Sequence, residues 1–377
     1  MKIVFLCGTL EPGRDGVGDY TRRLAAELIR QGHISVALSL NDKYISDKFD
    51  GVQQSEGVDL PVLRLASALP MNTRHSLAKK YIDDFNPDWI SLQFVIYTFH
   101  KKGLPLGVSK FLYNLGKNRQ WHIMFHEIWI GIHVGSSKAH FVIGRIQKRI
   151  IKNLVRVLKP SVIHTQTRFY QDQLTNMGFS CGYLPLFSNI PVLHAPENKK
   201  KQELNTIKLV IFGTIHPNSP INDFALEAAD YSKKRRVKIV FVFIGKCGNE
   251  QANWVSVCKS NGFEVVIMGE QSPETVSAVL TGSDIGVSSN DIPRVDKSGT
   301  VAAMLEHGLP VVCVSNPWVP RGTSGLKLSP PAGIIQYERG NIEVCLKTRE
   351  NRARVSNLEI TSSLLVADLS KKEIIVK

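Results

Sequence analysis

The chain has 377 residues, of which 43% are hydrophobic and 21% charged, the composition of an ordinary globular protein and not of a disordered or collagen-like one. One hydrophobic core rarely supports that length, so we expect two domains. The formal net charge of +14 favours anionic partners: nucleotide diphosphates, anionic lipid headgroups or nucleic acid. Every apolar run is interrupted well short of the roughly 20 residues that cross a bilayer, which predicts a soluble or peripheral protein.

The first half of the chain alternates strand and helix patterns. An apolar run at 2–8 (KIVFLCG) predicts a buried first strand. A secretion signal is not indicated, because the run is short and is not followed by a small-residue cleavage site. Apolar residues at helical spacing over 21–31 predict a helix that ends at Gly32, and ISVALSL predicts the next strand. This order implies a parallel sheet, and it continues through DWISLQFVIY, WHIMFHEIW and SVIHTQT. We therefore predict a Rossmann-like domain over 1–188.

The second half repeats the pattern after a break. Residues 189–206 carry two prolines, a lysine run and little apolar periodicity, so they are predicted to be a linker. The short apolar runs IKLVIFGT, VKIVFVFIG, FEVVIMG, DIGVSS and LPVVCVS suit a sheet covered on both faces and predict a second Rossmann-like domain over 207–350. Residues 351–377 are expected to form a closing helix and tail. The predicted fold class is α/β, with two parallel-sheet domains facing across a cleft.

The cysteines indicate no disulfide framework and no metal site. None forms a Cys-x-x-Cys pair with a histidine at metal-site spacing, and a free cysteine behaves as a small core hydrophobe. We expect buried thiols, no metal and a reducing cytoplasm. The six residues are Cys7, Cys181, Cys247, Cys258, Cys313 and Cys345.

Two loops precede predicted helices at strand ends, where backbone N–H groups can bind an anion. The first, at 12–20, contains Gly13, Gly16 and Gly18, which permit positive φ and a close approach to a ligand. A flexible turn explains the same glycines equally well. Although Asp42 follows the second predicted strand, the spacing is not the Gly-x-Gly-x-x-Gly of dinucleotide-binding proteins.

The second loop, at 288–300, places basic and hydroxyl side chains before a helical run. These residue types bind diphosphates through charge-assisted hydrogen bonds and the helix dipole. The alternative is that a hydroxyl only caps the helix while the basic residues are solvated. The candidate residues are Arg294, Lys297, Ser298, Gly299 and Thr300.

Three histidines and one glutamate deserve separate expectations. His126 follows a predicted strand and precedes Glu127, which makes it a candidate for contact with a substrate as well as for a satisfied core residue. His216 either contacts phosphate or is an ordinary loop residue. Glu306 and His307 end a helical run, and we expect both to be exposed.

Three segments together resemble glycosyltransferase family 4. They are the block Gly16-Val17-Gly18-Asp19-Tyr20-Thr21, the triplet Phe125-His126-Glu127 and the run Gly308-Leu309-Pro310-Val311-Val312. Their order and spacing extend over nearly the whole chain. The resemblance implies a retaining glycosyltransferase of the GT-B fold that needs no metal or other cofactor. The nucleotide would be held by the second domain, and the expected reaction moves a hexose from a nucleotide-diphosphate sugar to an acceptor. A glycan or lipid-linked acceptor is expected if the basic helix described below lies on a membrane.

The resemblance also assigns roles to residues. His126 would touch the donor sugar at the reacting centre, and the first domain would form the acceptor side, with Asp19, Tyr20 and Glu127 as contacts. Helix capping is an equally good explanation of Asp19. Gly16 and Gly18 would line the donor phosphates, Lys297 to Thr300 would bind the diphosphate, and the base would lie against Gly269, Glu270 and Gln271.

The sequence departs from the family pattern at two places. Many members carry two glutamates seven residues apart before the Gly-x-Pro-Val-Val segment, and Val295 and Ala303 occupy those positions here. Many members also have an Arg and a Lys after the first strand of the second domain, whereas Gly213 is followed by Thr-Ile-His-Pro-Asn-Ser. The chain is therefore expected to be a divergent member.

Basic residues recur at helical spacing over 141–159. Such a helix either packs on the core with a solvated face or lies on an anionic membrane, at the inner face of the cell membrane. No zinc spacing, helix-turn-helix pattern or aromatic-basic interleaving indicates nucleic acid. The basic residues are Arg145, Lys148, Arg149, Lys152 and Arg156.

Three functions remain open. The first is the glycosyltransferase already described. The second is a nucleotide-sugar epimerase of related fold, which needs acid-base groups at the sugar ring. The third is a catalytically silent adaptor that binds a sugar nucleotide.

Overall fold

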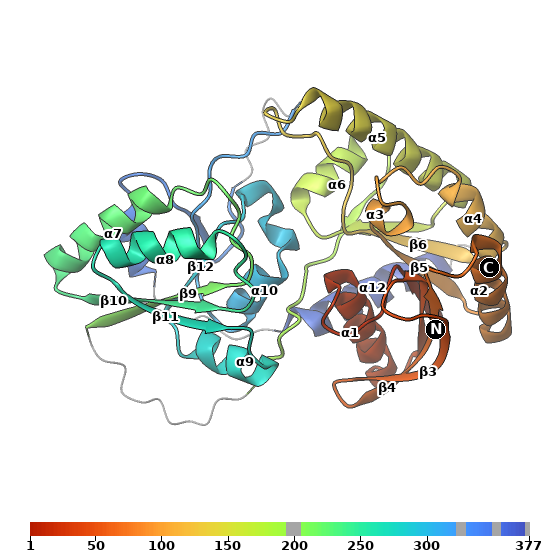
Figure 1. Cartoon of the computed structure of the whole chain (residues 1–377). Helices are drawn as coiled ribbons and strands as arrows, with labels where there is room; N and C mark the ends of the chain where they lie inside the picture. The colour runs from red at the N-terminus through yellow and green to blue at the C-terminus, as the bar shows by residue number, and fades with distance from the viewer. Residues whose placement is uncertain (194–204, 322–328, 349–355, 374–377) are drawn as a thin grey trace. The chain divides into compact units, whose positions relative to one another are not determined.

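The computed structural model describes residues 1–193, 205–321, 329–348 and 356–373 (Figure 1). The chain forms two compact units. The first contains Met1–Pro185, Val319–Ser324 and Leu358–Lys377, and the second contains Leu186–Trp318 and Gly325–Asn357. Most of the predicted linker, 194–204, lies outside the described residues, as do 351–355 and 374–377 of the predicted closing segment.

The first unit is built on an eight-stranded sheet in the order β3-β4-β2-β1-β5-β6-β7-β8. Neighbouring strands are parallel except β3 and β4, which form an antiparallel pair at one edge. The strands are β1 Lys2–Cys7, β2 Ile34–Asp42, β3 Lys48–Ser55, β4 Val58–Ala66, β5 Trp89–Phe94, β6 Gln120–Phe125, β7 Val162–Thr165 and β8 Gly182–Tyr183. The helices are α1 Gly16–Arg30, α2 Met71–Phe85, α3 Ile96–Phe99, α4 Val108–Leu115, α5 Lys138–Leu158, α6 Arg168–Thr175 and the C-terminal α12 Asn357–Glu373, which joins this unit from Leu358.

The second unit has a six-stranded parallel sheet in the order β11-β10-β9-β12-β13-β14. Its strands are β9 Thr206–Phe212, β10 Lys238–Ile244, β11 Glu264–Gly269, β12 Ile285–Ser288, β13 Val311–Cys313 and β14 Ile334–Gln336. Its helices are α7 Ile221–Arg235, α8 Gln251–Ser260, α9 Pro273–Thr281, the 3-10 helix η1 Ile292–Lys297, α10 Gly299–Glu306 and α11 Ile342–Lys347.

The inner strands β9 and β10 of the second sheet are buried along most of their length, which explains why they are nearly continuous apolar runs. Side chains alternate along a strand, and Leu209 and Ile211 of β9 pack into one core while Val210 packs into another. In β10, Phe243 and Val242 divide in the same way. Successive apolar residues are therefore required in the buried part of these strands, as expected for a parallel sheet between helices, whereas the edge strand β11 is mostly exposed.

The expectation of an α/β chain with two Rossmann-like parallel-sheet domains is confirmed. The sequence reading missed the edge pair of β3 and β4 and the short β14. Strand β3 has the sequence KFDGVQQS and is mostly exposed, so it carries no apolar pattern that would reveal it. Five cysteines are buried as expected and Cys181 is half-buried. Among the helices that the structure describes, none combines the length and apolar character of a bilayer-crossing segment.

Candidate functional site

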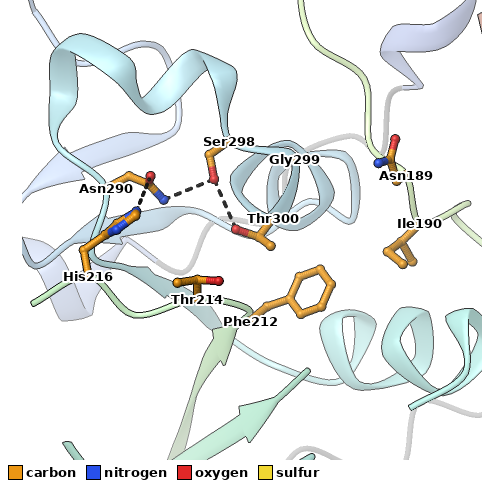
Figure 2. Close-up of a pocket in the computed structure, with 9 residues that line it drawn as sticks. All are labelled: Asn189, Ile190, Phe212, Thr214, His216, Asn290, Ser298, Gly299 and Thr300. Atoms are coloured by element: carbon orange, nitrogen blue, oxygen red, sulfur yellow. Dashed lines mark hydrogen bonds between the residues drawn. The ribbon is translucent and has the colours of Figure 1, made fainter. Parts of the chain in front are cut away.

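A pocket of about 340 Å³ lies in the second unit, where β9 and β12 end and α10 begins (Figure 2). The carboxyl ends of parallel strands are the usual place for ligands in such sheets. Two lining residues fall in the segment that was predicted to be a linker. The pocket is lined by Asn189, Ile190, Phe212, Thr214, His216, Asn290, Ser298, Gly299 and Thr300.

One wall of this pocket is a chain of hydrogen-bonded polar side chains (Figure 2). His216 Nε2 lies 3.3 Å from Asn290 Oδ1, and Asn290 Nδ2 donates to Ser298 Oγ over 3.1 Å. Ser298 Oγ in turn lies 3.1 Å from Thr300 Oγ1. The wall presents amide, imidazole and hydroxyl groups and carries no carboxylate, so it does not repel an anion.

Helix α10 begins inside the pocket. Ser298 is its N-cap, and Ser298 Oγ accepts a hydrogen bond from Val301 N over 3.4 Å. The first backbone N–H groups of an α-helix have no acceptor within the helix, and they carry the positive end of its dipole. The N–H groups of Gly299 and Thr300 are therefore suited to phosphate oxygens.

Gly213 lies between two residues that line the pocket, Phe212 and Thr214. Its φ of 77° lies in the left-handed region that favours glycine. A Cβ at this position would stand 2.6 Å from Thr300 Cγ2. Both constraints require glycine, and they bring the end of β9 against the first turn of α10.

The predicted diphosphate loop divides into two parts. Ser298, Gly299 and Thr300 line the pocket, whereas Arg294 and Lys297 belong to η1 and do not. Arg294 Nε lies 3.0 Å from both carboxylate oxygens of Asp291, and its guanidinium lies 5.0 Å from the ring centre of Trp318. The charge of Arg294 is thus already met by a neighbouring carboxylate.

The predicted base-binding loop lies at the end of β11, outside the pocket lining. Glu270 pairs with Lys246 at 3.1 Å, and both side chains are exposed. Gln271 Nε2 donates to Met268 O over 2.6 Å. Gly269 has a φ of 64°, so its glycine is explained by the turn after the strand.

Gly16 and Gly18 lie in the first turn of α1, in the first unit. Among the three glycines of the loop only Gly13 has positive φ, so Gly16 and Gly18 do not use the left-handed backbone that glycine permits. A Cβ on Gly18 would stand 2.5 Å from Thr9 O, so this glycine allows α1 to pack against the loop after β1. The helix is capped by Asp15, not by Asp19.

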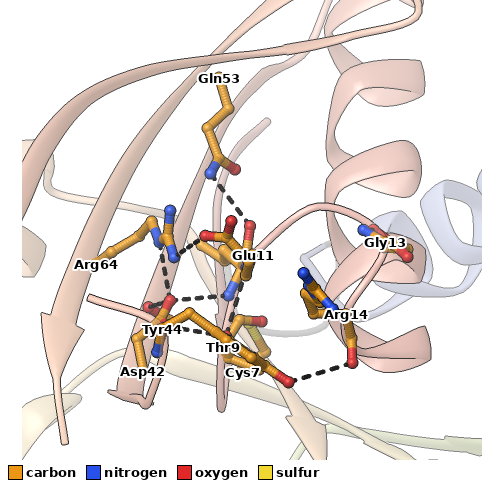
Figure 3. Close-up of polar contacts among 12 residues, drawn as sticks. Cys7, Thr9, Glu11, Gly13, Arg14, Asp42, Tyr44, Gln53 and Arg64 are labelled. Atoms are coloured by element: carbon orange, nitrogen blue, oxygen red, sulfur yellow. Dashed lines mark hydrogen bonds and ion pairs between the residues drawn. The ribbon is translucent and has the colours of Figure 1, made fainter.

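Asp19 is held by the loop before it and by the helix that contains it. Its Oδ1 accepts from Gly13 N over 3.0 Å and from Arg22 Nη2 over 3.1 Å. Asp42 holds the start of the loop after β1, because its carboxylate accepts a hydrogen bond from Thr9 Oγ1 over 2.9 Å (Figure 3). The same carboxylate accepts from Arg64 Nε over 2.8 Å.

His126 lies directly after β6 and is buried. Its Nε2 is 2.9 Å from Gln93 Oε1, and its ring meets the ring of Tyr20 edge-on with centres 4.9 Å apart. Burial raises the pKa of the Tyr20 hydroxyl, which therefore stays protonated at neutral pH. The structure thus brings His126 and Tyr20 together, while Glu127 is half-buried beside them in sequence.

Both positions where the family pattern has glutamate are apolar and buried. Val295 and Ala303 lie in a hydrophobic core of the second unit. A glutamate at either position would have to bury its charge. The two apolar residues belong to the same core, so both departures from the pattern fit the surroundings that the structure gives them.

The expectation that Glu306 and His307 are exposed is wrong, because both are buried. Glu306 Oε1 accepts from Ser188 N over 3.0 Å and from Asn357 N over 3.1 Å. His307 Nε2 lies 2.9 Å from Ser277 Oγ, and its Nδ1 donates to Ala303 O over 2.7 Å. The sequence showed two polar residues at a helix end, but it did not show the distant groups with which they form hydrogen bonds in the interior.

The described part of the chain contains no cluster of three or more His, Cys, Asp or Glu side chains that could hold a metal ion. No protein-family model and no curated protein sequence matches the chain. Solved structures do match it over nearly the full length.

One similar structure is Anabaena Alr3699/HepE in complex with UDP and glucose, at 16% identity and a TM-score of 0.53, covering 100% of this chain and 99% of that one. The UDP-GlcNAc 2-epimerase from Neisseria meningitidis, bound to UDP-GlcNAc, is 12% identical with a TM-score of 0.56 and coverage of 98% and 100%. WaaG, a glycosyltransferase involved in lipopolysaccharide biosynthesis, is 9% identical with a TM-score of 0.52 and coverage of 96% and 93%.

The chain has the GT-B fold. Identities this low establish the fold alone, and proteins with the GT-B fold in this set include both glycosyltransferases and epimerases. Sequence reasoning missed several pocket residues of the second unit, notably Asn189, Ile190 and Phe212, and it did not single out Asn290 within the predicted loop 288–300. A signal for Phe212 was present, because it ends a predicted parallel strand beside a glycine.

Proposed function

We propose that this protein is a retaining glycosyltransferase that moves a hexose from a nucleotide-diphosphate sugar to an acceptor. The observation that carries the proposal is the pocket at the N-terminus of α10, with hydroxyl and amide groups and no carboxylate in its lining. That chemistry suits a pyrophosphate, and UDP or a UDP-sugar is bound by two of the similar proteins.

In this proposal the pyrophosphate lies against the N–H groups of Gly299 and Thr300, with the hydroxyls of Ser298 and Thr300 as donors. Lys297, one residue before the N-cap, adds positive charge near the leaving diphosphate. The dipole of α10 and these donors stabilise the negative charge that develops on the diphosphate as the glycosidic bond breaks. The proposed reaction uses no metal ion and no other cofactor.

We assign His126 to the donor sugar and Tyr20, Asp19 and Glu127 to the acceptor side. His126 is a hydrogen-bonding group that would orient the sugar and stabilise charge at the reacting centre. Retention without a protein nucleophile follows if the departing diphosphate accepts the acceptor's proton on the same face. Gly16, Gly18 and the loop Gly269-Glu270-Gln271 remain assigned to the donor phosphates and base.

The test begins with ligand binding. Thermal shift against uridine, guanosine and adenosine diphosphate sugars identifies the donor, because a ligand that binds only the folded state raises Tm. Lys297→Ala is then expected to weaken donor affinity by about tenfold, a loss of about 1.4 kcal/mol. Lys259→Ala, which removes an exposed lysine in the last turn of α8 and outside the pocket lining, is the matched control. Equal affinities for the two variants would remove Lys297 from the diphosphate site.

A nucleotide-sugar epimerase is the second candidate, because a UDP-GlcNAc 2-epimerase has the same fold. Product analysis distinguishes the two. Release of nucleoside diphosphate on addition of an acceptor supports transfer, whereas a C2 epimer formed without acceptor supports epimerisation. Donor binding without either product would indicate a catalytically silent adaptor that only binds the sugar nucleotide.

For the acceptor we propose a lipid-linked or envelope glycan, reached at the inner face of the cell membrane through α5. Five basic side chains of this helix are all exposed: Arg145, Lys148, Arg149, Lys152 and Arg156. Phe141 and Val142 are exposed in the first turns of the same helix. A basic face with apolar residues at one end suits an anionic lipid surface.

Vesicle co-sedimentation tests the membrane contact. The pair Arg149→Glu and Lys152→Glu is expected to release the protein from vesicles that contain anionic lipid. The pair Lys233→Glu and Lys234→Glu makes the same charge change on the exposed end of α7 and is the control. Loss of binding in both pairs would indicate a nonspecific effect of net charge, and retention in the first pair would exclude α5.

A further inference from the structure

A row of buried polar side chains crosses three neighbouring strands of the first sheet and ends on the last helix. None of the strand members exposes more than 1% of its surface. Buried polar groups are retained only when they are hydrogen-bonded, and these bond to one another. The row, here called the relay, consists of Gln93 and Ser91 of β5, His122 of β6, His164 of β7 and Asp368 of α12.

The strand register explains why the relay is continuous. Ser91 pairs with His122, and Met124, two residues after His122, pairs with His164. Because side chains alternate along a strand, all of these residues lie on the same face of the sheet. Gly182 of β8 pairs with His164, and a Cβ there would stand 2.5 Å from His164 Cδ2, so a glycine makes room for the ring.

The distances form an unbroken path from His126. His126 Nε2 is 2.9 Å from Gln93 Oε1, and Gln93 Nε2 donates to Ser91 Oγ over 2.8 Å. Ser91 Oγ is 2.8 Å from His122 Nδ1, and His122 Nε2 is 3.1 Å from His164 Nδ1. His164 Nε2 is 3.1 Å from Asp368 Oδ2.

Asp368 gives this path its direction. A carboxylate only accepts, so His164 Nε2 must donate, and a neutral His164 then accepts at Nδ1. Partial burial raises the pKa of Asp368, but hydrogen bonds from Lys371 and His164 hold it below its usual range, which keeps the carboxylate ionised. Burial lowers the pKa of both His122 and His164, so both rings are neutral with one donor each.

The remaining donors and acceptors of the relay follow from that of His164. Since His164 accepts at Nδ1, His122 donates from Nε2 and accepts at Nδ1. Ser91 Oγ must donate its only hydrogen to His122 Nδ1, so towards Gln93 the hydroxyl can only accept. Gln93 therefore turns its NH₂ towards Ser91 and its oxygen towards His126. That oxygen requires a proton on His126 Nε2, which leaves Nδ1 of a neutral His126 as the acceptor.

We propose that Asp368 determines, through the relay, which ring nitrogen of His126 carries the proton. Asp368 and the relay are positioning groups, and His126 is the residue they prepare. The consequence for catalysis rests on the proposed function: a His126 with the wrong tautomer would offer a donor where an acceptor is needed, or the reverse.

The test is the protonation pattern of the imidazole nitrogens, read by long-range ¹H–¹⁵N correlation on the full chain labelled at histidine. The wild type is expected to show His126, His122 and His164 with the proton on Nε2. Asp368→Asn removes the charge at a half-exposed position, and it is expected to convert His126 to a mixture of tautomers. A wild-type His126 protonated on Nδ1, or an unchanged His126 in Asp368→Asn, would overturn the proposal.

A second variant interrupts the relay in its middle. Ser91→Ala is expected to give the same mixture at His126 together with a lower Tm. Thr165→Val is its control, because it removes another buried hydroxyl, which donates to Phe125 O over 2.9 Å, without touching the relay. A similar loss of Tm in both variants, with the tautomer of His126 changed only in Ser91→Ala, separates positioning from a structural role.

Activity then separates this proposal from the proposed function. If transfer is observed, Asp368→Asn is expected to lower kcat by about tenfold with little change in donor KM. This is less than the roughly 100-fold or more that loss of a positioned acid-base group causes, because His126 itself is retained and only part of it changes tautomer. If transfer is absent from the wild type, the proposed function fails, and the tautomer measurement still decides the role of Asp368.

Discussion

The two units contrast in how they use the N-terminus of a helix after a parallel strand. In the first unit, carboxylates occupy the N-terminal turn of α1, since Asp15 is the N-cap and Asp19 follows in the first turn. In the second unit, the N-cap of α10 is Ser298 and the first turn holds no acidic residue. The dipole of α1 is thus met by the protein's own charge, whereas the dipole of α10 remains for an anion.

The surroundings of the two helices differ in the same sense. Around the loop after β1, Asp42 and Arg64 form a buried ion pair, and Arg64 also pairs with Glu11 (Figure 3). Around α10, Asn290 and the neighbouring hydroxyls leave a pocket (Figure 2). The comparison teaches that the glycine-rich loop of the first unit is a weaker anion site than the N-terminus of α10, because Asp15 and Asp19 already meet the dipole of α1.

The largest effect is expected from breaking the ion pair of the first unit. Asp42→Ala leaves the guanidinium of Arg64 buried without its main partner, and removal of one partner from a buried pair typically destabilises by about 3–5 kcal/mol. Urea denaturation measures the change. Asp84→Ala, which breaks an exposed ion pair with Lys80, is the control and is expected to leave the midpoint unchanged. Equal midpoints for the two variants would show that the loop does not depend on Asp42.

Acid sensitivity is the second expectation. Burial alone raises the pKa of Asp42, but hydrogen bonds from Arg64, Tyr44 N, Leu10 N and Thr9 outweigh it and hold the pKa below its usual range. The carboxylate therefore stabilises the fold above the unfolded pKa of about 3.9, and that stability is lost as the pH falls through the folded value. Unfolding free energy measured from pH 6 to pH 3 should fall more steeply in the wild type than in Asp42→Asn.

The pocket of the second unit should respond in binding more than in stability. Ser298→Ala removes the cap and a donor of the polar wall, so donor affinity is expected to fall about tenfold, with a stability loss of about 1 kcal/mol. Ser272→Ala removes the N-cap of α9, whose Oγ accepts from Thr275 N over 3.3 Å, and should cost similar stability with unchanged affinity. Isothermal titration with the donor identified by thermal shift compares the two, and equal affinities would place the donor elsewhere.

The smallest effect is expected at Arg294. Because Asp291 already meets its charge, Arg294→Ala should weaken donor affinity by less than about threefold, or less than about 0.7 kcal/mol. Competition binding at two salt concentrations measures it. A loss as large as that of Lys297→Ala would show that Arg294 leaves Asp291 to contact the donor.

The sequence by itself determined the two parallel-sheet domains and the position of α10. Continuous apolar runs of strand length between helical patterns have few other solutions, and β9 to β13 were all predicted on that basis. The cap at Ser298 was likewise visible, because a serine before a glycine and a helical run is a local signal. Local signals cannot distinguish a polar residue at the surface from one that is satisfied in the interior.

Tertiary structure decided the rest. Glu306 is buried because Ser188 and Asn357, distant in sequence, present backbone N–H groups to it. The relay requires the register of three strands and the arrival of Asp368 from the last helix, 204 residues after His164. Hydrogen bonds between residues so far apart depend on how strands pair and helices dock, and no periodicity in a single chain records that.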